Sequence, residues 1–342
     1  MADRVVIVGT SRSKKGIPAS EIRQMMGRGG RKHGSGAYHV DVIVDEDINI
    51  EIADEIESQS SFQVKSSLGS LEETALNMLP EINDGSINNG DSAKEWMMST
   101  LHYAQTSETH DPSDLFNTLK EWGAIVEVGK KIMPTDICKA SVASYLHPMD
   151  IKMWSENLDT LVGFGFINND LAISWAFANC YKNKASGYMG EGYQNLLDKV
   201  RFSLPQELDY TSLQVGIATW WNVFGGPPIG NMKGVALGFK GDFPRISRAI
   251  KIARSDLSDL MDQLAVRARR GFPSKLSFLL GLENVSKSLA CNIYDQGITS
   301  ISDLNENLDN LHLDDDGDED YRLREILRKA LLGAELKGMI KE

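Results

Sequence analysis

Apolar side chains recur at helical spacing through most of this 342-residue chain. Side chains three and four residues apart share one face of a helix, so each such series predicts an amphipathic helix with one buried side. Clear series are Leu71, Ala75, Leu76 and Leu79; Leu115, Leu119 and Trp122; Leu158, Leu161, Val162 and Phe164; and Ile246, Ile250, Leu257, Met261 and Leu264. The pattern favours a mostly α fold, and the length allows two or three domains with cores of their own.

The first 52 residues differ from the rest. Two short β-branched runs, Arg4–Gly9 and Tyr38–Val44, predict strands, and a helix capped by Ser20 is expected between them. Residues 10–19 are rich in Ser, Lys, Gly and Pro, which indicates a loop. One helix and two strands cannot form an α/β domain alone, so residues 1–52 are interpreted as the tail of such a domain.

The predicted helix runs into the string Gln24-Met25-Met26-Gly27-Arg28-Gly29-Gly30-Arg31. Its spacing places Ile22, Met25 and Met26 on one face, which should be buried. Gln24, Arg28 and Arg31 fall on a second face, and two fixed guanidinium groups suit a phosphate. Gly27, Gly29 and Gly30 have no side chains, which lets a ligand or a second domain approach the backbone closely at this end of the helix.

This string resembles motif VI of the superfamily 2 helicases, in the branch of the archaeal DNA repair helicases, Ski-type RNA helicases and the polymerase theta helicase domain. The usual form is Q-M-x-G-R-A-G-R, and Gly29 replaces the alanine. The resemblance implies that Gln24 contacts the terminal phosphate of a nucleotide, and that Arg28 and Arg31 are catalytic arginine fingers between two RecA-like domains. The alternative is a basic amphipathic helix on a solvated face, which explains the arginines but not the glycines.

The same resemblance extends along most of the chain and implies four modules. Residues 1–52 are the C-terminal tail of the second RecA-like domain. Residues 60–155 form a winged helix, with a hairpin turning at Gly129, whose expected role is to brace that domain without contacting DNA. Residues 156–270 form a helical ratchet domain. Residues 271–342 form a helix-hairpin-helix-like cap in which Glu283 and Asn284 replace the usual hairpin glycines.

The second basic segment lies in the ratchet module. A long helix capped by Asp242 and reaching about Arg270 is expected to bury one apolar face and to present Arg245, Arg248 and Lys251 on the other. Such a face suits a sugar–phosphate strand, and these three residues are the candidate nucleic-acid-binding residues. In the resembling family a tryptophan on this helix stacks on bases, and here Ile252 stands at that place. A solvated basic face remains the alternative.

Tandem tryptophans at 220 and 221 offer another possible stacking platform, but apolar neighbours favour a place for them in the core.

The chain carries no G-x-x-x-x-G-K-[ST] phosphate loop. ATP and Mg²⁺ are therefore expected only in complex with an N-terminal helicase half that carries Walker A, and the chain alone should not hydrolyse ATP. The resemblance implies 3′-to-5′ movement on single-stranded DNA, with RNA as a possible substrate. The alternative function is a non-catalytic nucleic-acid- or protein-binding adaptor that has kept a helicase-derived fold.

Composition and charge limit the function classes and the cellular locations that suit this chain. The formal net charge of −12 argues against a surface coated with nucleic acid, although a local basic track is compatible with it. The acidic run 314–320 resembles a calcium loop but lacks its closing glutamate, so no metal site is expected. The three cysteines are far apart, which suggests a reducing compartment. No apolar run approaches about 18 residues, so an intracellular protein without membrane contact, cytoplasmic or nucleoid-associated, is expected.

Overall fold

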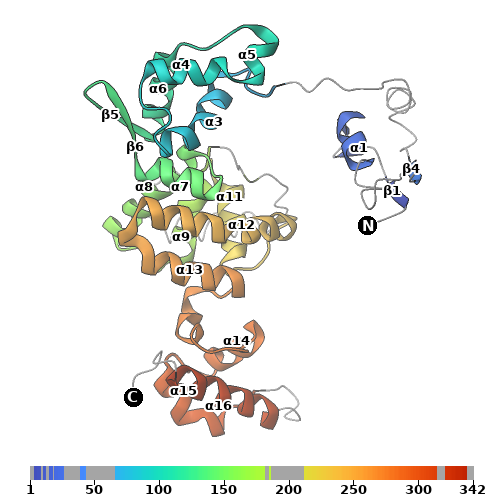
Figure 1. Ribbon diagram of the computed structural model, residues 1–342. Helices are drawn as coiled ribbons and strands as arrows, with labels where there is room; N and C mark the ends of the chain where they lie inside the picture. Colours follow the sequence, from blue (N-terminus) through green and yellow to red (C-terminus); the bar gives the residue numbers. More distant parts are fainter. Residues whose placement is uncertain are drawn as a thin grey trace. The chain divides into compact units, whose positions relative to one another are not determined.

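The computed structural model describes residues 4–8, 11–12, 15–17, 19–26, 39–43, 66–181, 185, 212–313 and 320–336. The chain divides into two compact units, Met1–Ser66 and Ser67–Glu342. Among the described residues, helices predominate and the strands are few and short (Figure 1). The expected mostly α fold with a small α/β segment is therefore confirmed at the level of fold class.

The first unit contains a parallel strand pair with a helix between its strands in the chain. Strands β1 (Arg4–Val8) and β4 (His39–Ile43) are parallel and in register from Arg4↔His39 to Val8↔Ile43. Helix α1 (Ala19–Met26) buries Ile22 against Ile7 and Ile17. Since α1 begins at Ala19, the expectation that Ser20 caps it is wrong.

A second correction concerns the stretch before α1. Within the predicted loop, β2 (Ser11–Arg12) and β3 (Lys15–Gly16) form a short antiparallel pair. A composition typical of loops therefore does not exclude a hairpin of two-residue strands.

The first part of the second unit is a helical cluster with a two-stranded wing. Its elements are α3 (Leu71–Asn83), α4 (Gly90–Met98), α5 (Leu101–Thr106), α6 (Pro112–Glu121), β5 (Ile125–Val128), β6 (Lys131–Pro134) and α7 (Asp136–Ser144). The wing is antiparallel and turns at Gly129, whose φ is +65°, as the sequence predicts. The predicted stripe of α6 is buried together with the isoleucines of the wing, Ile125 and Ile132.

Two features of this cluster differ from what local sequence predicts. A proline usually ends a helix, yet α3 continues past Pro80 to Asn83 and buries Ile82. Because Pro80 lies on the exposed side of α3, water can satisfy the carbonyl that loses its helical partner. The apolar series from Trp96 to Ala104 predicts one helix, but the chain forms α4 and α5 there. Thr100 starts the new helix, because its hydroxyl accepts a hydrogen bond from the Tyr103 amide at 3.3 Å.

A helical bundle follows, formed by α8 (Pro148–Phe164), α9 (Asp170–Ala178), α11 (Gln214–Val223), α12 (Met232–Ala253), the short 3-10 turn η2 (Ser255–Leu257) and α13 (Ser258–Arg270). Aromatic rings fill its centre, with Phe177, Trp220, Phe224 and Phe243 packed at centroid distances of 5.2–6.1 Å. Trp220 is 1% exposed, so the prediction that it belongs to the core is confirmed. Helix α8 crosses the expected module boundary at residue 155 and packs with the bundle.

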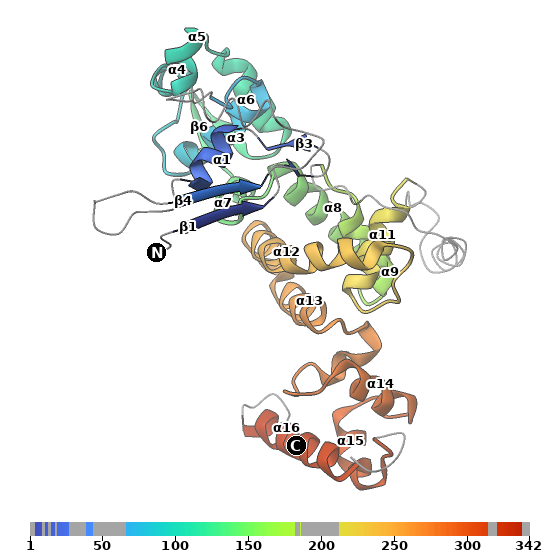
Figure 2. The ribbon, with the colours of Figure 1, turned by 90° about the vertical axis from the view of Figure 1, so that its right-hand side faces the viewer.

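The long basic helix expected from Asp242 to Arg270 is two helices. Helix α12 already begins at Met232, so Asp242 lies in its interior and caps nothing. The chain leaves the helix at Arg254, whose φ and ψ are −144° and 83°, and re-enters through η2 into α13. The apolar periodicity continues across this break because both helices bury one face in the same core, as their adjacent positions in Figure 2 show.

The C-terminal part has a core of its own. Its elements are the 3-10 segment η3 (Ser274–Leu279), α14 (Lys287–Asp295), α15 (Ile301–Asn307), the 3-10 turn η4 (Leu308–Asn310) and α16 (Asp320–Leu336). Ser286 and Ser300 cap α14 and α15 by accepting hydrogen bonds from the amides of Leu289 and Asp303 at 3.2 and 3.0 Å. Its buried side chains run from Phe272 to Ala334, with α16 packed over the rest.

Candidate nucleic-acid interface

The motif helix α1 divides its side chains as the sequence predicts, as far as it is described. Ile22 is fully buried, Met25 is half-buried, and Gln24 lies exposed away from them. The side chain of Met26 is not among those that the structure describes, so its expected burial stays a prediction. Arg28 and Arg31 lie outside the described residues. Gln24 is therefore the one member of the predicted nucleotide-sensing set that the structure places, and its exposure leaves its amide open to a phosphate.

Helix α12 presents a continuous row of small and basic residues to the outside. At 100° per residue, Gly234, Gly238, Gly241, Arg245 and Arg248 fall within about 40° of one line along the helix. All five are exposed. A Cβ added at any of these three glycines would meet no atom within 4 Å. The 22 residues of α12 carry five Lys or Arg side chains against one Asp, in a chain whose net charge is −12.

The three predicted strand-binding residues differ in whether their positive charge already forms an ion pair with a carboxylate of this chain. Arg245 pairs with Asp242, one turn before it, at 3.1 Å, and both side chains are about half exposed. Lys251 is less available, because its ammonium group lies 2.6 Å from Asp262 of α13. Arg248 is exposed and makes no ion pair with any residue that the structure describes. The structure thus brings Arg245 and Arg248 together on one row and ties Lys251 to the neighbouring helix.

Position 252, where the resembling family has a stacking tryptophan, faces partly inward. Ile252 is half-buried and packs against the bundle core. An isoleucine there supplies no flat ring on which a base could stack.

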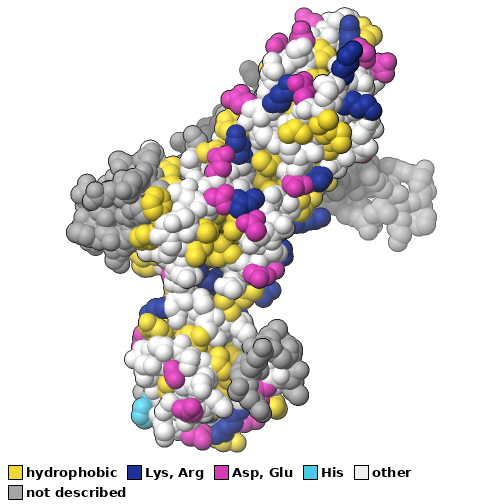
Figure 3. All heavy atoms as spheres, turned by 90° about the vertical axis from the view of Figure 1, so that its left-hand side faces the viewer, with side chains coloured by type: hydrophobic (Ala, Val, Ile, Leu, Met, Phe, Trp, Pro, Cys, Tyr) yellow, Lys and Arg dark blue, Asp and Glu magenta, His cyan; other side chains and the backbone are white. Residues whose placement is uncertain are grey.

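On the face drawn in Figure 3, Lys and Arg side chains are interspersed with Asp and Glu side chains. Such mixing agrees with the net charge of −12 and leaves any attraction for a polyanion to local features such as the row on α12.

A cavity of about 580 Å³ opens beside the basic end of this row. Helices α3, α7, α8 and α12 all contribute to it, and Arg245 is the residue from α12. Leu76, Leu79 and Val142 give it apolar walls, while Tyr145 and Asp150 add polar groups. Its volume lies within the range of about 300–1,000 Å³ typical of ligand sites.

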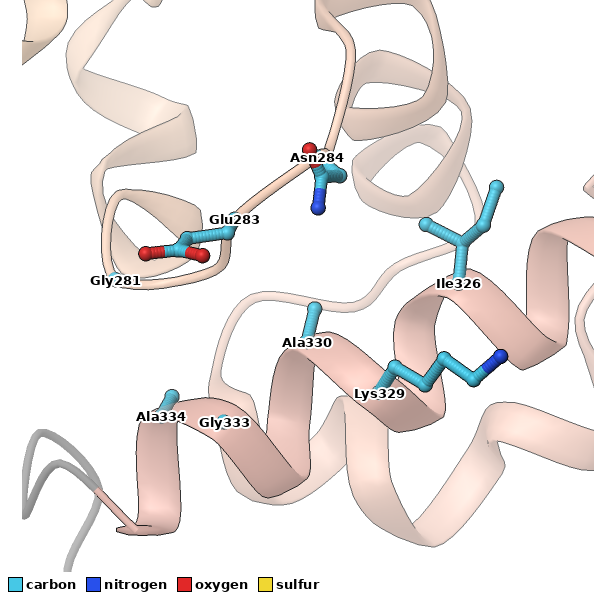
Figure 4. A pocket seen from close by; sticks show the side chains of 8 residues that line it. All are labelled: Gly281, Glu283, Asn284, Ile326, Lys329, Ala330, Gly333 and Ala334. Carbon is cyan, nitrogen blue, oxygen red and sulfur yellow. The ribbon is translucent and has the colours of Figure 1, made fainter.

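The predicted hairpin at Glu283 and Asn284 lies opposite α16 rather than on an open surface (Figure 4). Asn284 adopts a left-handed conformation with φ of +61°, so the tight turn exists although glycine is missing. Lys329, Ala330 and Gly333 of α16 complete a cavity of about 290 Å³ with the hairpin. Glu283 places a carboxylate at this turn, and a carboxylate repels a phosphate group.

Two features of this region were not predicted from the sequence. The glycine row was visible as the spacing 234, 238, 241, and was missed because the helix was expected to start at Asp242. Tyr145 gave no signal, since a single tyrosine between apolar residues looks like a member of the core.

The described residues contain no group of three or more His, Cys, Asp or Glu side chains placed to hold a metal ion. The acidic run 314–319, considered for calcium, lies outside the description. Within the same limits, none of the helices has the length and apolarity needed to cross a membrane. No family model and no curated protein matches this sequence.

Proposed function

We propose that this chain is the C-terminal part of an ATP-dependent 3′-to-5′ superfamily 2 helicase, and that α12 holds the translocating single strand. One observation carries the proposal: the outward row of α12, in which three open glycines lead into two exposed arginines. The expected motif VI residues Gln24, Arg28 and Arg31 supply the other half of the argument.

The row suits a sugar–phosphate backbone for physical reasons. Helix α12 is about 33 Å long at 1.5 Å per residue, enough to follow several nucleotides. Glycines let the strand approach the helix backbone, and Arg245 and Arg248 donate charge-assisted hydrogen bonds to phosphate oxygens. Such contacts are independent of sequence, as a motor that moves along any strand requires.

An exposed apolar face on the first unit supports the proposal of a partner polypeptide. Val6 and Val8 of β1 are 51% and 77% exposed, and they share a face with the exposed Ile43 of β4. A parallel pair normally has both faces covered, so this apolar face fits burial against further α/β structure. That structure would be the N-terminal helicase half that carries Walker A and binds ATP and Mg²⁺.

In the assembled enzyme, bound ATP supplies the phosphoryl group whose transfer drives movement. The residues of this chain would sense and stabilise it: Gln24 at the terminal phosphate, and Arg28 and Arg31 against the charge that develops during transfer. An arginine finger is worth roughly 10³–10⁵ in rate. The winged-helix-like cluster, 66–144, would brace the second RecA-like domain, and the helix-hairpin-helix-like cap would close the C-terminal end.

The test begins with a pull-down of the tagged chain from its native lysate, followed by mass spectrometry. We expect a partner with G-x-x-x-x-G-K-[ST], and ATPase activity that neither polypeptide shows alone. In the reconstituted complex, Arg31→Ala should abolish ATPase while leaving single-strand affinity near normal. Equal loss of both activities would refute the arginine-finger role.

A non-catalytic adaptor is the second candidate function. The net charge of −12 and the carboxylate of Glu283 at the hairpin favour it, because both weaken contact with nucleic acid. If the chain is an adaptor, the pull-down should recover repair, replication or RNA-processing factors and no ATPase partner. Comparing DNA and RNA oligonucleotides of one sequence in the binding assay would then identify the preferred strand.

A further inference from the structure

Tyr145 adopts a backbone conformation that its side chain disfavours. It ends helix α7 with φ of 55° and ψ of 38°, and its amide donates to the Ser141 carbonyl at 2.8 Å. Glycine takes this left-handed role at the ends of α8 and α13, at Gly165 and Gly271. In the described part of the chain, the other non-glycine residues with positive φ are Ser107 and Asn284, which are small or short and polar.

Burial does not compensate for this conformation. Tyr145 is 89% exposed, more than any other large apolar or aromatic residue that the structure describes. A bulky residue in the left-handed region is a backbone outlier, and such outliers cluster at functional sites. Because packing gives no reason for tyrosine here, its exposed ring points to a ligand.

The surroundings of Tyr145 indicate which ligand. It borders the cavity of about 580 Å³ that Arg245 of α12 also borders. The cavity has apolar walls, and Asp150, which is fully buried, contributes a carboxylate to its lining. The Asp150 carboxyl group accepts a hydrogen bond from the Tyr181 amide. Its oxygens are hydrogen-bond acceptors, so the interior suits a donor group rather than an anion, while Arg245 attracts an anion at the rim.

We propose that Tyr145 is a base-stacking residue: one nucleobase of a single strand on α12 lies on its ring at the mouth of this cavity, and the adjoining phosphate contacts Arg245. The proposal rests on the proposed strand-holding role of α12 and adds to it the residue that separates bases. A flat, apolar base edged with amino groups matches apolar walls and a buried carboxylate, and its phosphate matches the guanidinium group. In this arrangement α7 supplies the aromatic ring that α12 lacks at Ile252.

A base can reach the ring only when it is unpaired, so the site selects single strands over duplex. Stacking on an aromatic ring tolerates every base because each has a π face, and it is worth about 1–3 kcal/mol per base. The site should therefore add affinity without sequence preference.

The unusual backbone of Tyr145 permits an experiment in which stability and binding move in opposite directions. Glycine fits φ of 55° better than tyrosine, so Tyr145→Gly should raise the melting temperature of the full chain by about 2–4 °C. The same substitution removes the ring and should weaken binding to a fluorescein-labelled dT15 oligonucleotide by about 5- to 150-fold, measured by anisotropy. Tyr145→Phe keeps the ring and should bind as the unmodified chain does.

Tyr321→Ala is the matched control, since Tyr321 is 76% exposed on α16 and borders neither the cavity nor α12. It should leave affinity unchanged. An oligonucleotide containing 2-aminopurine supplies a direct readout, because stacking on the ring quenches its fluorescence. Quenching should be lost with Tyr145→Gly and kept with Tyr145→Phe.

The outcomes separate the two proposals. Unchanged affinity and quenching in Tyr145→Gly, with weaker binding in Arg248→Ala, would overturn the stacking role and leave the role of α12 standing. Unchanged binding in both variants, or no binding by the unmodified chain, would overturn both. Weakened binding in Tyr145→Phe equal to that in Tyr145→Gly would show that the hydroxyl, not the ring, makes the contact, and would also overturn stacking.

Discussion

Helices α12 and α13 lie side by side in the bundle, and both carry arginines, yet the arginines have opposite surroundings (Figure 2). On α12, Arg245 and Arg248 face outward. On α13, Arg267 is buried and Arg270 is half-buried, and both bind groups of the same chain. The partners of an arginine, rather than its presence on a helix, decide whether it stabilises the fold or remains available to a ligand.

The Arg267 side chain joins three elements of the bundle and the cap. Its guanidinium group pairs with Asp170 at the start of α9, donates to the Phe272 carbonyl at 3.2 Å and lies 5.6 Å from the centre of the Phe224 ring. Asp170 also accepts a hydrogen bond from the Ser274 amide at 3.0 Å. With so many partners inside the chain, Arg267 has no capacity left for a phosphate.

The largest expected effect tests this structural arginine. Arg267→Met should lower the free energy of unfolding by about 3–5 kcal/mol, because it leaves the carboxylate of Asp170 in a mostly buried place without its charged partner. Urea denaturation of the full chain measures the loss. Arg269→Met is the control, since Arg269 is exposed on the same helix and should change stability by less than about 0.5 kcal/mol. Equal small effects for both substitutions would contradict the comparison.

The second prediction concerns the attachment of the cap. Arg270 donates to the carbonyls of Leu279 and Leu282, and burial lowers the pKa of its guanidinium group without discharging it. Arg270→Ala should cost about 1.5–3 kcal/mol, as expected for hydrogen bonds from a charged donor. Hydrogen exchange should locate the loss in residues 279–295. A loss confined to α13 instead would show that Arg270 stabilises its own helix and not the cap.

The third prediction tests the outward arginines. Arg248→Ala should leave stability within about 0.5 kcal/mol and should weaken single-strand binding at every sequence alike. The slope of log affinity against log salt should fall in magnitude by about 0.7, the value for one phosphate contact on a single strand. Arg269→Ala, an exposed arginine of α13, should change neither quantity. If it weakened binding as much, the row on α12 would not be the specific track.

The smallest effect concerns the junction between the two helices. Arg254 binds Asp159 and Asp256, and its hydrogen bond to Asp256 lowers the pKa of that carboxyl group below 3.8. A lowered folded pKa stabilises the fold above about pH 4 and loses that contribution as the pH falls through the folded value. Asp256→Asn should therefore lower the melting temperature slightly at pH 7, and this decrease should shrink as the pH falls below about 4. A decrease that does not change with pH would point to lost packing instead of charge.

The sequence predicts the parts of the fold that depend on apolar periodicity. The wing turning at Gly129, the buried stripe of α6 and the core position of Trp220 follow from spacing and from glycine chemistry alone. The helix break at Arg254 was not predictable in this way, because the apolar pattern continues through it while the backbone does not.

The candidate site was predictable only in part. Arg245 and Arg248 are recognisable from their spacing on a basic helix. The pairing of Lys251 with Asp262 depends on the break at Arg254, which turns α13 back alongside α12. The position of Tyr145 beside Arg245 depends on helices brought together from distant parts of the chain. Local sequence carries no information about such contacts, which become visible only in the three-dimensional structure.

Helix α12 also contains Pro244, placed between its glycine half and its arginine half. Proline cannot donate to the carbonyl of Lys240, and the glycines before it each weaken a helix by about 1 kcal/mol relative to alanine. The first half of α12 therefore owes its helical form to the packing of Met232, Ala236 and Phe243 and little to its own sequence. It follows that α12 has one fewer internal hydrogen bond at a single defined point, where the half that contains the glycines meets the half that contains the arginines.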